Sequence, residues 1–223
     1  MKPKLFAEAI GKFACGVVLV GMLLFLPAGT LRWSRGWLLM GVLFLPMFAA
    51  GLVMLKKNPT LLTRRLQAKE SKTDQQLLIR LSGLMFILAF VSAGLSFRFG
   101  WLLLPDWVSY AAAAVFLIAY LLYAEVLREN TWLSRTIEVQ ENQTVVDTGL
   151  YGIVRHPMYS ATLLLFLSMP LVLGSVIGFV FLLFYPFLIV RRIRGEEQLL
   201  ETELNGYAAY KQKVKYRLIP FIW

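Results

Sequence analysis

Cysteine, histidine and charge are all scarce in this chain. Its 223 residues include one cysteine (Cys15) and one histidine (His156), and 16% are charged, against about a quarter in an ordinary soluble domain. A single cysteine excludes an intramolecular disulfide and a cysteine-based metal cluster, so we expect Cys15 to pack among apolar neighbours and we expect no metal site. The shortage of charge excludes a soluble fold, because a soluble protein of this size must cover its surface with polar groups.

Hydrophobic residues are abundant and make up 58% of the sequence. Four apolar runs, at residues 11–28, 36–55, 77–97 and 107–127, are each long enough to cross a hydrocarbon layer roughly 30 Å thick as a helix. The alternation of apolar and polar residues that a membrane barrel needs is absent. Tryptophans stand at the ends of the runs, where indole rings favour the headgroup region: Trp33, Trp37, Trp101 and Trp107.

The apolar segment 158–190 has a different character, because it is too long for one ordinary span and Pro170, Gly174 and Gly178 interrupt its middle. We expect a hairpin of two helices of about 15 residues each, short enough that full crossing of the bilayer is not required. Residues 191–215 are polar and are expected to form a cytoplasmic amphipathic helix with a break at Gly206.

The predicted fold is therefore all-α: a polytopic integral membrane protein with about five to six membrane helices, including a C-terminal helical hairpin, plus a cytoplasmic C-terminal helix. Residues 1–127 are expected to form a four-helix transmembrane region, and residues 128–223 a second region that carries the polar motifs.

Basic residues outnumber acidic ones by 23 to 13, which gives a net charge of +10. The interleaving of aromatic and basic residues that is typical of RNA-binding motifs is absent, so we expect no nucleic-acid partner. With the N-terminus in the cytoplasm, only Arg32, Arg35 and Arg98 fall on the outer side. The positive-inside rule therefore places both termini in the cytoplasm, with the basic loops against anionic lipid headgroups.

Two polar clusters flank the hairpin. The first ends in Arg155 and His156, and the second begins at Arg191 and contains Glu196 and Glu197. Since the hairpin leaves and returns at one membrane face, we expect the two clusters to be neighbours. Each cluster also has an ordinary explanation: Arg-His-Pro can start a helix, the arginines can be a stop signal, and the carboxylates can be solvated.

Together, the run TGLYGIVRHPMYSA and the later RIRGEEQLLETELNGYAAYKQKVKYRLIPFIW resemble the isoprenylcysteine carboxyl methyltransferase family, which is grouped with the membrane phospholipid methyltransferases. The resemblance extends over roughly residues 130–223, and the loop NPTLLTRRLQAKESKTDQQ resembles the family more weakly. The residues that carry it are Gly149, Tyr151, Arg155, His156, Pro157, Tyr159, Arg192, Glu196, Glu197, Gly206, Tyr207, Tyr210, Arg217, Ile219 and Pro220.

The resemblance implies methyl transfer from S-adenosyl-L-methionine, bound by residues 128–223, to a lipophilic or prenylated acceptor that enters from the lipid bilayer. The cofactor contacts that it implies are Gln140, Gln143, Thr144, Val145, Val146, Gly149, Tyr151, His156, Pro157, Met158, Tyr159 and Glu197. The catalytic candidates are Arg192, Arg194, Glu196 and Arg155.

The chemistry of the acceptor decides what these residues must do. An isoprenylcysteine-like carboxylate is ionised at neutral pH and needs a cation to hold it, for which Arg192 or Arg194 comes first and Arg155 next. An amine must lose a proton before it attacks, and a carboxylate such as Glu196, or His156, would then act as the base. The crowding of arginines around the Glu-Glu pair favours the carboxylate.

Two other functions stay open on the sequence alone. An NADPH-dependent membrane reductase of the sterol type ends in a similar Tyr-Arg-x-Ile-Pro element, although the Glu-Glu pair favours methyl transfer. A transporter or scaffold is the third hypothesis, but transporters show internal repeats and polar groups at mid-membrane, whereas this chain gathers its polar groups at one face. The membrane would be the plasma membrane in a prokaryote and the endoplasmic reticulum in a eukaryote, and the sequence indicates no oligomeric state.

Overall fold

The computed structural model describes residues 3–67, 73–134 and 136–223, and throughout these ranges the chain forms helices joined by loops. The elements are α1 (Pro3–Ala28), α2 (Ser34–Lys57), α3 (Pro59–Gln67), α4 (Thr73–Phe99), α5 (Asp106–Glu129), the short 3-10 helix η1 (Gly149–Gly152), α6 (Pro157–Val172), α7 (Val176–Leu182), α8 (Tyr185–Glu203) and α9 (Tyr207–Lys213). The predicted all-α fold is confirmed.

Five segments of the described chain are long and apolar enough to cross a membrane: Lys4–Ala28, Ser34–Lys57, Gln75–Phe99, Asp106–Glu129 and Val176–Glu203. α6 is a shorter apolar helix. Large side chains on these helices point outward, and Leu26, Leu45 and Leu121 are each more than 70% exposed. Such a surface is stable only against lipid, so the protein is an integral membrane protein.

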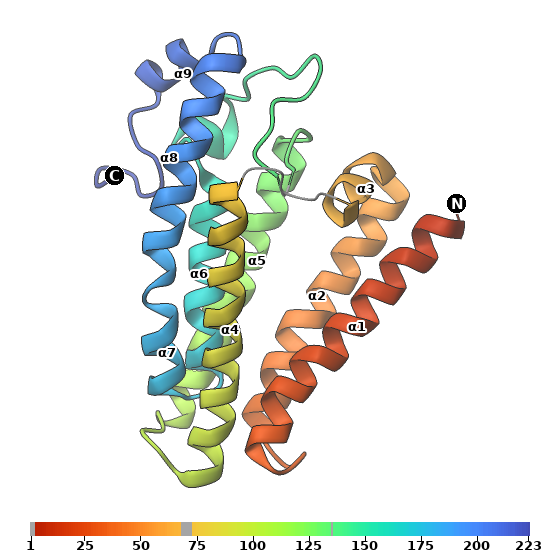
Figure 1. Cartoon of the computed structure of the whole chain (residues 1–223), viewed down its shortest axis with the longest axis vertical. Coiled ribbons are helices and arrows are strands. Elements are labelled where there is room, and N and C mark those ends of the chain that lie inside the picture. Colours follow the sequence, from red (N-terminus) through yellow and green to blue (C-terminus); the bar gives the residue numbers. More distant parts are fainter. Residues whose placement is uncertain (1–2, 68–72, 135) are drawn as a thin grey trace.

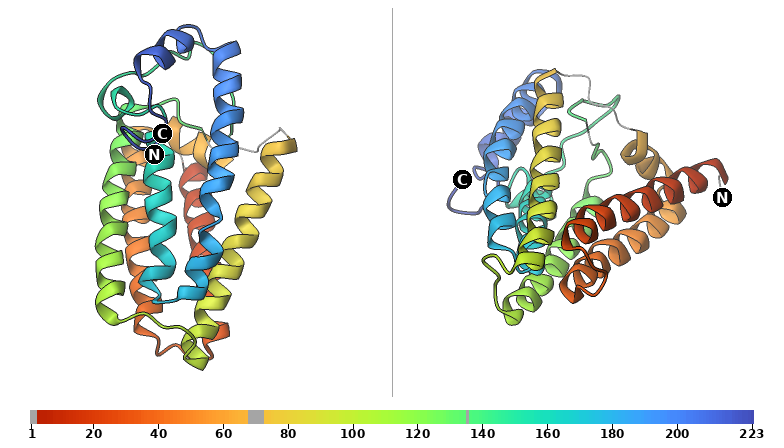
Figure 2. Two further views of the ribbon diagram at one scale, coloured as in Figure 1. Left: turned by 90° about the vertical axis from the view of Figure 1, so that its left-hand side faces the viewer. Right: turned by 60° about the horizontal axis from the view of Figure 1, so that its bottom comes forward.

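The helices are arranged in two groups (Figures 1 and 2). α5 packs along α6, and α4 lies against α7 in the larger group. α1 and α2 form a pair that meets this group through contacts of α1 with α4 and of α2 with α5. Leu24, Phe116 and Val172 are fully buried in the core that joins the two groups. Toward the end that carries α3 and α9 the pair leans away from the larger group (Figure 1).

The predicted hairpin is present, with its turn at residues 173–175 between α6 and α7. Gly174 has a φ of +71°, a backbone conformation that disfavours any other residue, and a Cβ atom at this position would also displace the guanidinium of Arg35. Ser175 caps α7 by accepting a hydrogen bond from the Gly178 amide at 3.1 Å. Pro170 and Gly178 lie within α6 and α7 rather than in the turn.

One prediction about the second arm of the hairpin is wrong. Residues 191–203 do not begin a separate amphipathic helix, because α8 starts at Tyr185 and continues through Arg191 to Glu203. The chain breaks only afterwards, at Gly206, where a φ of +86° precedes α9. This break at Gly206 is the predicted one. α8 therefore carries the polar motif beyond the apolar segment as one continuous helix.

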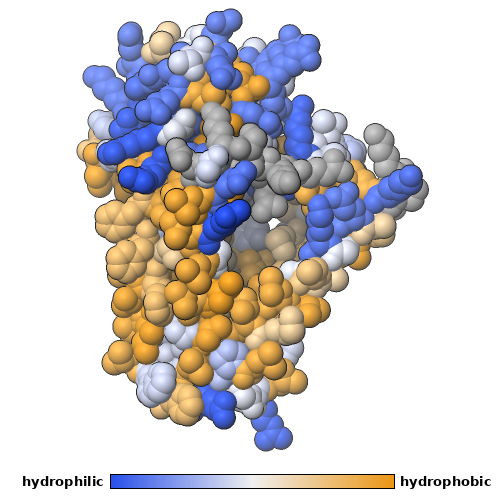
Figure 3. Space-filling model, in the orientation of Figure 1, coloured by the Kyte–Doolittle hydropathy of each residue, from blue (hydrophilic) through white to orange (hydrophobic). Residues whose placement is uncertain are grey.

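Polar residues gather at one end of the molecule. Figure 3 shows an apolar surface over the lower part of the helices and a hydrophilic cap at the end that carries α9. α3, which the sequence analysis did not predict, lies at this level (Figure 1). Leu62 and Leu66 hold it against Leu5 on α1 and Leu55 on α2. Residues 68–72 of the loop with family-like sequence lie outside the described residues.

Candidate active site

The chain beyond α9 supports the candidate site through backbone hydrogen bonds to Arg155 and His156. The amide of Arg155 donates to the carbonyl of Tyr216 at 2.9 Å, and the amide of His156 donates to the carbonyl of Arg217 at 2.9 Å. Pro157 then opens α6, where its missing N–H costs nothing and its fixed φ suits the first turn. The two motifs, separated by about sixty residues, are thereby held side by side.

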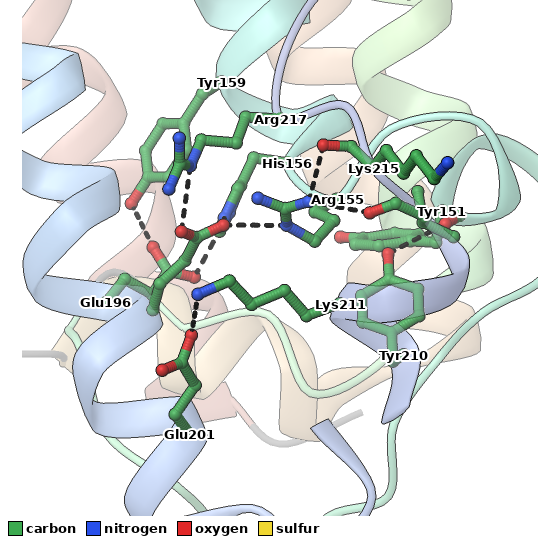
Figure 4. Close-up of polar contacts among 12 residues, drawn as sticks. Tyr151, Arg155, His156, Tyr159, Glu196, Glu201, Tyr210, Lys211, Lys215 and Arg217 are labelled. Atoms are coloured by element: carbon green, nitrogen blue, oxygen red, sulfur yellow. Dashed lines mark hydrogen bonds and ion pairs between the residues drawn. The ribbon is translucent and has the colours of Figure 1, made fainter. Parts of the chain in front are cut away.

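Glu197 ties these segments together. Its Oε1 accepts from Nε of Arg155 at 2.8 Å and lies 3.2 Å from Nε2 of His156, and its Oε2 accepts from Nε of Arg217 at 2.9 Å. Arg155 also donates to the carbonyls of Val214 and Lys215. Glu197, Arg155 and His156 are all buried. The predicted proximity of the Arg-His and Glu-Glu clusters is confirmed (Figure 4).

Glu196 takes part in a second, more open chain of contacts. The hydroxyl of Tyr159 donates to Oε2 of Glu196 at 2.6 Å, and Nε of Arg192 donates to the same hydroxyl at 3.0 Å. Oε1 of Glu196 lies 4.0 Å from Nδ1 of His156. Figure 4 shows the Glu196 carboxylate turned toward Tyr159 from α8. A carboxylate, a phenol and a guanidinium thus stand in a row at the polar end of the bundle.

Two cavities meet at this row. The first lies among the 130–146 loop, the start of α6, α8 and α9, and the open space between its walls is about 840 Å³ including the part continuous with solvent. The second is walled by side chains of α3, α4, α5, α6 and α8, with Ile79, Phe166 and Ile189 among them. Ser134, Met158, Tyr159 and Arg192 line both cavities. A ligand in either cavity can therefore reach the same side chains.

The loop before α6 is positioned by glycine and tyrosine contacts. Gly149 has a φ of +51°, and a Cβ atom there would overlap the carboxylate of Glu129, which accepts from the Leu150 amide at 2.9 Å. The hydroxyl of Tyr210 donates to the Tyr151 carbonyl at 2.8 Å. Burial raises the pKa of both Tyr151 and Tyr210, so their phenols stay neutral at physiological pH.

Most residues predicted from the sequence line the first cavity, but not all of them. Arg155, Arg192 and Glu196 do, together with eight of the cofactor candidates: Gln143, Thr144, Val145, Val146, Tyr151, His156, Met158 and Tyr159. Gln140, Gly149, Pro157 and Glu197 lie behind the walls and support them. Arg194 lines neither of the two cavities and lies in an exposed groove beside Leu77 and Trp223.

Sequence reasoning assigned no role to three aromatic residues of the first cavity. Trp132 lines it from the loop after α5, and Tyr207 and Tyr210 line it from α9. Tyr207 is buried, and its hydroxyl has no hydrogen-bond partner among the described residues. Burial raises its pKa, as do the carboxylates of Glu197 and Glu196, so it keeps its proton. The Gly-Tyr-x-x-Tyr motif was the signal for Tyr207, and an isolated Trp in a polar loop was the signal for Trp132.

A buried hydroxyl without a partner costs free energy unless a ligand or water satisfies it. The Tyr207 hydroxyl therefore marks a point where the first cavity is suited to a hydrogen-bonding ligand.

Comparison with known proteins covers much of the segment that forms this site. Residues 108–202 match the isoprenylcysteine carboxyl methyltransferase (ICMT) family. The chain is also similar to the Delta(14)-sterol reductase of Mus musculus, with 31% identity over 91 residues. That alignment covers 40% of this chain and 22% of the reductase, so the chain matches only about a fifth of its relative's length. The resemblance predicted from the motifs is confirmed for residues 108–202, which include Arg155–His156 and Glu196–Glu197 and match the isoprenylcysteine carboxyl methyltransferase family.

Proposed function

We propose that this protein is a membrane methyltransferase that uses S-adenosyl-L-methionine to methylate a lipophilic acceptor. The observation that carries the proposal is the pair of cavities that share Tyr159 and Arg192. One cavity has polar and aromatic walls at the hydrophilic end, and the other has largely apolar walls between membrane helices. A transferase for a polar donor and a lipid acceptor needs such a pair of sites with one common wall.

The first cavity fits the cofactor by the chemistry of its walls. S-adenosyl-L-methionine, when bound, supplies a methyl group on a positively charged sulfur. Glu196 provides a carboxylate for a cationic ligand, and Trp132 and Tyr151 provide aromatic surfaces for a nucleobase. Tyr207 supplies the hydroxyl described above. Both carboxylate oxygens of Glu197 are engaged by Arg155, His156 and Arg217, and we assign Glu197 the task of holding His156 and Arg155 in place.

The second cavity is the proposed acceptor site. Arg192, on its wall with the first cavity, would hold a carboxylate oxygen of the acceptor close to Tyr159. Transfer to a carboxylate requires no general base, because that group is already ionised at neutral pH. The remaining task of the protein is to align the two ligands and to exclude water from between them.

The orientation in the membrane is part of the proposal. α3 and the C-terminal end of α2, which carry basic residues, lie at the same end as α9 (Figure 1). The opposite end holds the connection from α1 into α2 and the C-terminal end of α4, to which Arg32, Arg35 and Arg98 belong. The positive-inside rule then directs the first cavity toward the cytoplasm, where the cofactor is made.

Binding of S-adenosylhomocysteine to detergent-purified protein tests the cofactor site. We expect saturable binding in calorimetric titration, and we expect Glu196→Gln to weaken it about tenfold, because a charge-assisted hydrogen bond of roughly 1.5–3 kcal/mol becomes a neutral one. Glu203→Gln is the matched control, since Glu203 is an exposed carboxylate on the same helix. Unaltered affinity of the Glu196 variant would remove Glu196 from the site.

Tyr207→Phe provides a second test with two readouts. Because the hydroxyl has no partner among the described residues, we expect the melting temperature of the ligand-free protein to stay the same or to rise slightly. The affinity for S-adenosylhomocysteine should fall two- to tenfold, the equivalent of one neutral hydrogen bond of about 0.5–1.5 kcal/mol. A loss of stability without a change in affinity would show that the hydroxyl serves the fold.

The similarity to a sterol reductase favours one second candidate, a nicotinamide-dependent membrane reductase. NADPH carries several negative charges, and the first cavity offers few cations for them. Arg155 is already engaged by Glu197 and two backbone carbonyls, and Arg192 donates to Tyr159. Titration with NADPH beside S-adenosylhomocysteine separates the two functions. Saturable binding of NADPH alone, in folded protein, would establish the reductase and overturn the methyltransferase.

A further inference from the structure

Arg65 on α3 lies outside the family-matched segment and yet reaches the second cavity. Its Nη2 donates to the hydroxyl of Tyr123 on α5, and its guanidinium carbon lies 5.4 Å from the centroid of the Tyr123 ring. Both side chains are half-buried and both line the cavity. Leu62 and Leu66 fix α3 against α1 and α2, and the contacts with Tyr123 hold the guanidinium at the cavity.

The charge of the second cavity is positive. Arg65, Arg80 and Arg192 line it, and none of its described lining residues is an aspartate or glutamate. Glu196 belongs to the walls of the first cavity. Leu78, Leu188 and Ile189 contribute apolar surface beside the arginines. Charges interact more strongly next to apolar walls than in water, so this cavity favours a ligand with an apolar body and a negatively charged group.

We propose that Arg65 is an acceptor-selecting residue, which binds an anionic oxygen of the lipid headgroup, carboxylate or phosphate, inside the second cavity. The inference rests on the proposed function and deepens it. Arg192, at the wall shared with the first cavity, holds the part of the headgroup that reacts, and Arg65, from the α3 side, discriminates charged from uncharged lipids. The contact with Tyr123 holds the guanidinium at the cavity wall.

A merely structural role for Arg65, as a link between α3 and α5, makes a different prediction. Loss of such a link would lower stability and weaken all ligands of the cavity alike. Selection by charge instead changes the affinity for an anionic lipid and leaves that for its neutral analogue unaltered.

The test is equilibrium binding to the full chain in lipid nanodiscs, with three probes: N-acetyl-S-farnesyl-L-cysteine, its uncharged carboxamide, and farnesyl phosphate. We expect the wild-type protein to bind at least one anionic probe about tenfold or more tightly than the carboxamide. Arg65→Gln should abolish this preference, and Arg65→Lys should retain part of it because the charge remains. Lys57→Gln, an equal change of charge at an exposed residue at the end of α2, should have no effect.

Titration with S-adenosylhomocysteine separates this inference from the proposed function. Arg65→Gln should leave that affinity unchanged, because Arg65 does not line the first cavity. Equal affinity of the wild-type protein for all three probes, or an equal loss for all of them in Arg65→Gln, overturns the role of Arg65 even if S-adenosylhomocysteine binds. Charge selection without any binding of S-adenosylhomocysteine supports the role of Arg65 and overturns the methyltransferase. The more tightly bound anionic probe distinguishes a carboxylate from a phosphate headgroup.

Discussion

Glu197→Gln is expected to lower the free energy of unfolding by about 3–5 kcal/mol, the usual loss when one partner of a buried ion pair is removed. The carboxylate is 3% exposed and contacts Arg155, His156 and Arg217. A neutral amide leaves the Arg155 guanidinium buried without a counter-charge, and the amide's N–H₂ group would face donors on at least one side. The walls of the first cavity that depend on Arg155 and His156 should loosen together.

Unfolding of the detergent-solubilised protein by denaturant, followed by circular dichroism, measures this loss. Glu201→Gln is the control, because Glu201 on the same helix pairs with Lys211 at the surface, and exposed pairs contribute only about 0–1 kcal/mol. If Glu197→Gln lowers the free energy of unfolding as little as Glu201→Gln does, Glu197 does not hold α6, α8 and the C-terminal segment together.

The membrane architecture could be predicted from the sequence because the length of an apolar run indicates whether it can cross the bilayer. Apolar runs bounded by tryptophan and basic residues fix the positions of α1, α2, α4 and α5, and Gly174 marks the turn of the hairpin. α3 could not be predicted, since its nine residues are mostly polar and owe their helical form to packing against α1 and α2. The continuity of α8 was missed for a related reason. Composition changes abruptly at Arg191, but arginine, glutamate and leucine are all good helix formers, and the helix continues.

The candidate site could be predicted as a neighbourhood but not in detail. Topology alone brings the two ends of the hairpin to one membrane face, which places Arg155 near Glu197. Adjacent carboxylates look equivalent in a sequence. On a helix they diverge by about 100°, so Glu196 turns to the cavity while Glu197 turns into the protein.

The same helix geometry places the arginines of α8 on different faces. Arg192 lies one turn before Glu196 and shares its face, whereas Arg194, two residues further on, points to the other side. Which side is which depends on the rotation of α8 against α4 and α6, and that rotation is a property of tertiary packing.

This difference leads to the largest expected effect on activity. Arg192→Gln should reduce the kcat/KM for methylation of N-acetyl-S-farnesyl-L-cysteine about 100- to 1000-fold, as expected when a positioned cationic donor is removed from the reacting oxygen in a water-poor site. Arg194→Gln removes the same charge from the same helix, but from the exposed groove, and should change the rate less than threefold. Transfer of a labelled methyl group to the acceptor measures both rates.

The distribution of the loss between kcat and KM identifies what Arg192 does. Under the proposed function, Arg192 at the wall common to both cavities holds the oxygen that reacts, so its removal should lower kcat even when acceptor saturates the enzyme. Arg65 lines the proposed acceptor cavity but not the first cavity. Its replacement should instead raise KM and leave kcat nearly unchanged. If Arg192→Gln raises KM alone, Arg192 is a second binding residue, and another group at the common wall must hold the reacting oxygen. Tyr159, whose hydroxyl donates to Glu196, is then the first candidate.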